Sequence, residues 1–120
     1  MKLYRYIVKD TNVGILVYLD KAFNSDTDDG LDMIYQLCWP FEEYLKKPNI
    51  DGYPCSKFWF TEKGNRKFNK AIRKIRKEYS SKGIEVERLE MNIDDNSDDI
   101  IYRDEYQVAI RKYKRKMIIG

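Results

Sequence analysis

The chain has 120 residues, of which 42% are hydrophobic and 36% are charged, and its formal net charge is +3. This length is typical of one domain with one hydrophobic core, which we expect to span 1–120. The sequence contains no histidine and only two cysteines. These counts exclude serine-hydrolase triads, cysteine–histidine nucleophiles, and zinc sites built from histidine or from four cysteines.

The apolar segments of the chain are short. The longest apolar run without a charge, 13–19, is far below the roughly 20 residues that a membrane span needs. No apolar stretch of the kind found in secretory signals follows the N-terminus. We therefore expect a cytoplasmic protein without membrane contact. Two reduced thiols are the more common arrangement in such a protein, but the sequence leaves open whether Cys38 and Cys55 pair.

The chain begins with a predicted strand, 2–9, which is rich in aromatic and β-branched residues. Asp10 or Thr11 then caps a predicted helix that runs to about residue 24, with apolar residues at helical spacing. An alternative is open here, because 13–18 also fits a strand.

Polar turn residues at 24–30 separate this helix from the next one. Residues 31–37 predict a short helix, which Pro40 interrupts before it starts a further helical turn through 41–45. The prolines and glycine of 48–54 then predict an irregular loop.

The second half of the chain begins with a short aromatic strand, 57–61. The strongest helix prediction follows, over 62–81, because four apolar residues recur at spacings of four, three and four and form one narrow stripe that must face the core. These residues are Phe68, Ile72, Ile75 and Tyr79.

Strands are predicted again after this helix. Gly83 ends the helix, and 84–91 alternates as a half-buried strand with Ile84 and Val86 inward, together with Leu89 or Met91. An acidic loop follows at 92–99. Residues 100–103 and 106–112 then predict one bent strand or a hairpin.

This order of elements is typical of an α+β domain. We expect a small mixed or antiparallel sheet of about four strands, with helices packed mainly on one face. The long helix between two strands also permits a right-handed βαβ crossover. The basic C-terminal tail, 113–120, is expected to fray.

Charge is unevenly distributed along the chain. Residues 62–82 contain nine bases and two acids, whereas 84–102 contain one base and seven acids. A row of like charges destabilises a helix, and binding to an anionic partner such as phosphate would offset that repulsion. The alternatives are a solvated face, a nucleic-acid site and a site for an acidic protein surface. The candidate partner-binding residues are Lys63, Arg66, Lys67, Lys70, Arg73, Lys74 and Lys77.

The acidic loop supplies a candidate secondary surface, which would mimic a phosphate backbone toward a basic partner. Neither this loop nor the segment from Asn24 matches a calcium-binding EF-hand, because that segment has Asp29 where glycine is needed and Tyr35 where glutamate is needed. We expect a solvated loop, with no metal ion and no cofactor. Whether the loop folds over the basic helix is left open. Its carboxylates are Asp94, Asp95, Asp98 and Asp99.

Three stretches, 1–6, 59–64 and 104–110, resemble small accessory proteins carried by phages and mobile elements of low-GC bacteria. Some proteins of this type, the anti-CRISPR and other anti-defence inhibitors, bind a bacterial nuclease or its nucleic acid and block it. The resemblance implies a non-enzymatic inhibitor that acts in the cytoplasm of a bacterial host by steric blocking of a protein or ribonucleoprotein. Its oligomeric state is left open.

Two other functions are also open. A small nucleic-acid-binding protein would use the basic helix directly, with 111–116 as an auxiliary clamp. An ADP-ribosyltransferase-like enzyme would use Arg5 on the first strand and Glu105 on a late strand, although an ordinary cross-strand ion pair is the simpler interpretation. No phosphate-binding glycine loop, GxSxG motif or CxxC motif is present. We therefore expect a binding protein and no enzyme.

Overall fold

The computed structural model describes residues 1–48 and 56–111, so Cys55 and the predicted frayed tail 113–120 lie outside the described residues. The elements are β1 (Lys2–Val8), α1 (Leu19–Ala22), α2 (Asp28–Tyr44), β2 (Lys57–Thr61), α3 (Glu62–Lys67), α4 (Asn69–Ser81), β3 (Val86–Asn92), β4 (Ile100–Arg103) and β5 (Gln107–Ile110). None of the helices in these ranges is long and apolar enough to cross a membrane.

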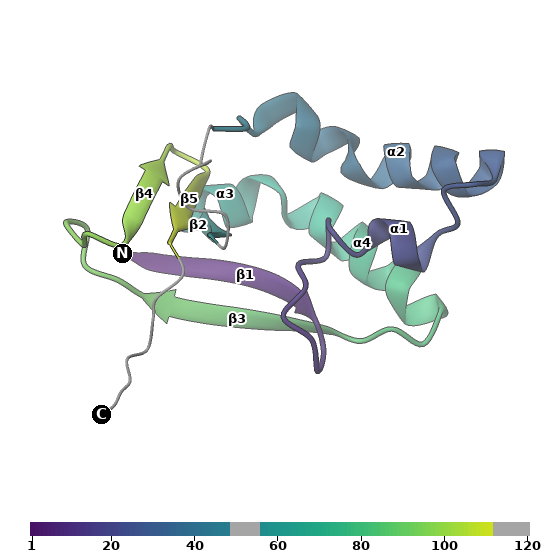
Figure 1. Cartoon of the computed structure of the whole chain (residues 1–120), viewed down its shortest axis with the longest axis horizontal. Coiled ribbons are helices and arrows are strands. Elements are labelled where there is room, and N and C mark those ends of the chain that lie inside the picture. Colours follow the sequence, from purple (N-terminus) through teal and green to yellow (C-terminus); the bar gives the residue numbers. More distant parts are fainter. Residues whose placement is uncertain (49–55, 112–120) are drawn as a thin grey trace.

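The strands form a single sheet in the order β3-β1-β2-β5-β4, and each neighbouring pair is antiparallel. Figure 1 shows α2 and α4 on the same side of β1 and β3. The predicted α+β class is therefore confirmed. The described part of the chain has five strands where about four were expected, and the sheet is antiparallel throughout.

The connection from β2 to β3 runs through α3 and α4. Both strands are antiparallel to β1 and lie on either side of it, so they run in the same direction. The predicted βαβ connection is thus present in a split form, with β1 between its two parallel strands. This topology lays the apolar stripe of α4 across the helix-covered face of β1.

The core is centred on Phe68, which lies between α3 and α4 and packs against α2 and β2. Its ring stacks on Phe41 with 5.0 Å between centroids. Phe60 lies 5.7 Å away, and Tyr106 lies 5.8 Å away in an edge-on arrangement. Because aromatic rings bury large areas and pair favourably at these distances, this cluster fixes α2 against the sheet.

The helix predicted from residue 10 to about 24 is wrong over most of its length. Asp10 adopts a positive φ of 65°, and the chain turns back along β1. The N–H of Val8 donates to Val13 O at 3.0 Å, and the N–H of Ile15 donates to Tyr6 O at 3.1 Å. The segment therefore pairs with the edge of β1 that β2 leaves free, and only the short helix α1 remains of the prediction.

The predicted break at Pro40 is also wrong, because α2 is one continuous helix of 17 residues with Pro40 inside it. Proline removes one backbone donor and costs a helix interior about 3 kcal/mol. Burial of apolar side chains before and after Pro40 compensates for this cost, since Leu37 is 1% exposed and Phe41 is 2% exposed. The Oγ1 of Thr27 caps the start by accepting from Gly30 N at 3.0 Å.

The helix predicted over 62–81 is present as two segments. Its backbone changes at Phe68, which has φ −98° and ψ 9° and separates α3 from α4. Hydrogen bonds still bridge the change, because Phe68 N donates to Gly64 O and Ile72 N donates to Phe68 O. The two segments therefore continue in nearly the same direction, as Figure 1 shows.

The beginning of α3 is joined to the turn between β4 and β5. Thr61 Oγ1 accepts from Gly64 N at 3.0 Å and donates to Glu105 O at 2.6 Å. Gly64 lies so close to this turn that a Cβ atom there would come within 2.0 Å of Tyr106 O. The turn itself is closed by the Asp104 carboxylate, which accepts from two backbone N–H groups. This arrangement confirms the hairpin alternative for the end of the chain.

The inward residues of β3 were only partly predicted. Val86 pairs with Val8 and contacts the main core, as expected. Met91 pairs with Leu3, and Leu89 pairs with Arg5, so both lie on the opposite face of the sheet. The prediction that Leu89 or Met91 points inward together with Val86 is wrong as to the face, because their spacing from Val86 is odd, although both side chains are half-buried on the other face.

Candidate partner-binding surface

The exposed side of α3 and α4 carries the predicted partner-binding residues. The apolar stripe on the other side is buried, since Phe68, Ile72, Ile75 and Tyr79 are each at most 3% exposed. At 100° per residue, the bases project away from this stripe, and each of them is exposed. The structure thus places all the predicted residues on one surface, called the basic face below. It consists of Lys63, Arg66, Lys67, Lys70, Arg73, Lys74 and Lys77.

One ion pair reaches the basic face within the described residues. Lys63 Nζ lies 2.9 Å from a carboxylate oxygen of Glu105, and both side chains are more than half exposed. The hydrogen bond between them raises the pKa of Lys63 and lowers that of Glu105. An exposed pair of this kind contributes little to stability and competes weakly with a partner.

A second base is held by aromatic rings. Lys67 Nζ lies 3.7 Å from the ring centroid of Tyr44 and 5.6 Å from that of Tyr106. In the part of the chain that the structure describes, the other five bases of the face have no ion pair. The face is therefore a largely uncompensated positive surface.

The acidic loop does not cover the basic face. Asp95 pairs with the N-terminal amine at 3.3 Å, and that amine also donates to Ile93 O at 2.8 Å. Asp99 pairs with Arg111 at 2.9 Å. The loop is thus attached to the N-terminus and to the end of β5, which answers the question that the sequence left open. Its predicted surface residues Asp94, Asp95 and Asp98 are exposed, and Asp99 is half-buried.

The two residues of the transferase hypothesis have separate partners. Arg5 donates to Asn12, both to its Oδ1 at 2.9 Å and to its backbone O at 3.0 Å. The Glu105 carboxylate instead contacts Lys63. The structure therefore does not bring Arg5 and Glu105 together as a pair.

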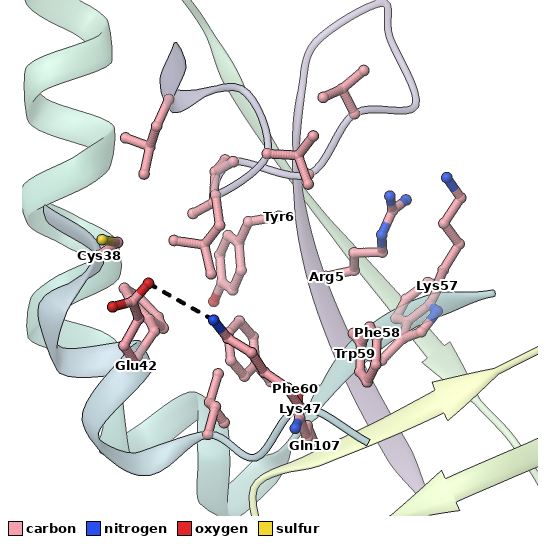
Figure 2. A pocket seen from close by; sticks show the side chains of 18 of the residues that line it. Arg5, Tyr6, Cys38, Glu42, Lys47, Lys57, Phe58, Trp59, Phe60 and Gln107 are labelled. Atoms are coloured by element: carbon pink, nitrogen blue, oxygen red, sulfur yellow. Dashed lines mark ion pairs between the residues drawn. The ribbon is translucent and has the colours of Figure 1, made fainter. Parts of the chain in front are cut away.

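The sequence reasoning missed a cavity between α2, β1 and β2, with a volume of about 680 Å³. Figure 2 shows Arg5 and Lys57 on one side of it and Cys38 and Glu42 of α2 on the other. One signal was available, because Arg5 shares a face of the first strand with two apolar residues, Leu3 and Ile7. A charged residue in that position indicates an unusual environment.

The cysteine prediction can be followed for Cys38 alone. It is a half-buried free thiol that lines the cavity. Burial, assisted by the nearby Glu42 carboxylate, raises the pKa of this thiol. A raised pKa favours the protonated form, which is a poor nucleophile. No group of three or more potential ligands that could hold a metal ion occurs among the residues that the structure describes.

Comparisons with protein families, curated proteins and solved structures found no match to this chain. What can be said of its function therefore depends on the chemistry of its surfaces and of its cavity.

Proposed function

We propose that this chain is a non-enzymatic binding protein that uses the basic face of α3 and α4 to contact an anionic partner. One observation carries the proposal: five bases of this face have no ion pair within the described residues. Phosphates suit such a surface, because lysine and arginine neutralise them and arginine forms bidentate hydrogen bonds. Binding would also relieve the repulsion between neighbouring bases on α4.

The proposed partner is a nuclease ribonucleoprotein of a bacterial host, which the bound protein would block sterically in the cytoplasm. The resemblance of three stretches to anti-defence inhibitors supports this choice. Steric blocking needs a complementary surface and no catalytic group. The separate position of the acidic loop supports it as well, because a basic and an acidic surface could then contact different parts of one assembly.

Binding to free nucleic acid is the rival function. Proteins that bind single strands usually combine bases with exposed aromatic rings on which nucleotide bases stack. Phe68, between α3 and α4, and Tyr79 of α4 are both buried, and the exposed ring of Tyr44 beside the basic face is already contacted by Lys67. This arrangement favours phosphate contacts over base stacking, and it gives less support to a dedicated single-strand binder.

A charge-reversal experiment tests the proposal. The double variant Lys70→Glu/Lys77→Glu changes the basic face, and Lys21→Glu/Lys46→Glu applies the same change in net charge at exposed lysines elsewhere. Each protein is immobilised and exposed to a bacterial lysate that contains an RNA-guided nuclease. We expect the wild type and the control to retain the ribonucleoprotein and to inhibit its cleavage activity, and the basic-face variant to do neither.

Naked DNA and RNA, single- and double-stranded, are titrated in parallel at two salt concentrations. Tight binding that falls steeply with salt would replace the inhibitor proposal with direct nucleic-acid binding. Equal retention of the ribonucleoprotein by both double variants would overturn the role of the basic face.

A further inference from the structure

The cavity beside β1 arises from the way the sheet opens. β2 pairs with β1 only at Leu3 and Tyr4. Beyond this point the edge of β1 pairs around Gly14 with the segment 12–19, which turns back along β1 and is called the returning segment. β2 and β1 therefore diverge, and the cavity passes through the gap between them. It extends from Phe41 and Phe60 on the helix-covered face of the sheet to Arg5, Lys57 and Trp59 on the other face. The volume of about 680 Å³ is within the range of roughly 300–1,000 Å³ that is typical of small-molecule sites.

The walls of this cavity are mainly apolar. Aliphatic side chains come from the returning segment and α2, and aromatic rings come from β2 and α2. Such walls fit the apolar body of a ligand and offer few hydrogen bonds to a sugar or a base. The apolar lining residues include Ile15, Leu19, Ile34, Phe41, Trp59 and Phe60.

Arg5 is the unusual group in this lining. It is only 7% exposed, and within the described residues its guanidinium donates two hydrogen bonds, both to the neutral residue Asn12. No carboxylate forms an ion pair with it among the described residues, and burial alone lowers its pKa. Buried charges in proteins are normally paired with an opposite charge. A guanidinium has five N–H donors, so Arg5 retains the capacity to bind an anion.

The other charges of the cavity give it a direction. Lys57 lies on the same side as Arg5 in Figure 2 and has no ion pair within the described residues. Glu42 lies on the α2 side, where its carboxylate is 4.0 Å from Lys47 Nζ. Asp20 and Lys46 are the remaining charged lining residues. The side with Arg5 is therefore the positive end of the cavity.

We infer that this cavity binds a small amphipathic carboxylate, whose anionic head contacts Arg5 and Lys57 and whose apolar body lies against Phe41, Trp59 and Phe60. A nucleotide fits less well, because the chain has no glycine-rich phosphate loop and the cavity walls are apolar. The same chemistry is shared by free fatty acids and by carboxylate-bearing aromatic metabolites. The site is separate from the basic face and does not depend on the proposed function.

Tryptophan fluorescence provides the assay. The chain has two tryptophans, and Trp39 is 60% exposed on α2, so Trp39→Phe leaves Trp59 in the cavity as a single reporter. Laurate is the probe, and dodecanol is the uncharged control of the same length. We expect a saturable change in Trp59 emission with laurate and at least tenfold weaker binding of dodecanol.

Two variants in the same background locate the head group. Arg5→Gln removes a charge-assisted hydrogen bond to the carboxylate and should weaken laurate binding about tenfold or more. Lys57→Gln should weaken laurate binding by a smaller factor. Lys77→Gln removes an exposed charge from the basic face and should bind laurate as the parent does. If Arg5→Gln fails to fold, Lys57→Gln decides, because Lys57 is exposed.

Several results would overturn the inference. These are the absence of a saturable signal with laurate, equal affinity for laurate and dodecanol, or unchanged laurate binding in the folded variants of both cationic residues. A saturable response to ADP in place of laurate would also reject the carboxylate and identify a nucleotide site.

Discussion

Lys70 provides a direct test of the unbalanced charge on α4. It lies three residues from Arg73 and four from Lys74, and all three side chains are exposed without an ion pair within the described residues. Like charges at these spacings destabilise a helix by about 0.2–0.5 kcal/mol per pair, and opposite charges stabilise it by a similar amount. Lys70→Glu converts two repulsive pairs into attractive ones, so we expect a gain of roughly 1 kcal/mol in the free energy of unfolding. The first turn of α4 has no acid at present, and a carboxylate there also interacts favourably with the helix dipole.

Thermal unfolding followed by circular dichroism measures this effect. At low ionic strength the melting temperature of Lys70→Glu should exceed that of the wild type by about 4 °C. Lys70→Gln, which only removes the repulsion, should gain about half as much. The differences should shrink at about 0.5 M salt, because exposed charges are screened there.

A melting temperature that is unchanged or lower in Lys70→Glu at low salt would refute this reasoning. It would mean that the basic face is already neutralised, and the proposed function would lose its main support. If the reasoning holds, the same substitution raises stability and weakens binding of the anionic partner. Opposite signs of this kind are expected when a surface is kept for binding at the expense of stability.

Three further predictions concern the fold, and each is checked by urea unfolding followed by circular dichroism. Phe68→Ala removes the centre of the aromatic cluster and should lower the free energy of unfolding by about 3–5 kcal/mol; a loss below about 1 kcal/mol would contradict the packing described. Gly64→Ala should lower the urea midpoint, although alanine favours helices, because the new Cβ would clash with Tyr106 O. A higher midpoint would show that the turn between β4 and β5 moves away from residue 64 at little cost. Tyr79 Oη donates to Ile15 O at 2.5 Å, so Tyr79→Phe leaves a buried carbonyl unpaired and should cost about 1–3 kcal/mol. Burial raises the pKa of Tyr79, so the unfolded chain releases this proton first and stability should fall as the pH rises above about 10; Tyr79→Phe should lose less stability over that range, and an identical alkaline slope would contradict the assignment.

Local sequence patterns predicted the segments whose structure depends mainly on their own residues. The stripe from Phe68 to Tyr79 marks a helix because its spacing matches the helical period, and the core then buries it. The predicted start of that helix at residue 62 is also confirmed, because the preceding Thr61 supplies a capping oxygen to Gly64 N. The aromatic and β-branched residues of the first strand were equally informative.

Predictions failed where a distant partner overrides the local pattern. The segment after Asp10 has helical spacing of apolar residues, but it pairs with Tyr6 and Val8 because β2 leaves that edge of β1 free. Pro40 normally ends a helix, yet burial of Leu37 and Phe41 on both sides maintains α2. Both outcomes depend on contacts that no local window contains.

The sequence by itself determined the α+β class and the position of the bases along one helical surface, because both follow from residue spacing over a few turns. Only the tertiary structure decided whether those bases are neutralised. Charges interact through space, and the acidic loop is held at the N-terminus and at Arg111, away from the basic face. The same holds for Arg5, which has the sequence context of a strand residue. It becomes a buried guanidinium, with no counter-ion among the described residues, only when β1, the returning segment and β2 come together.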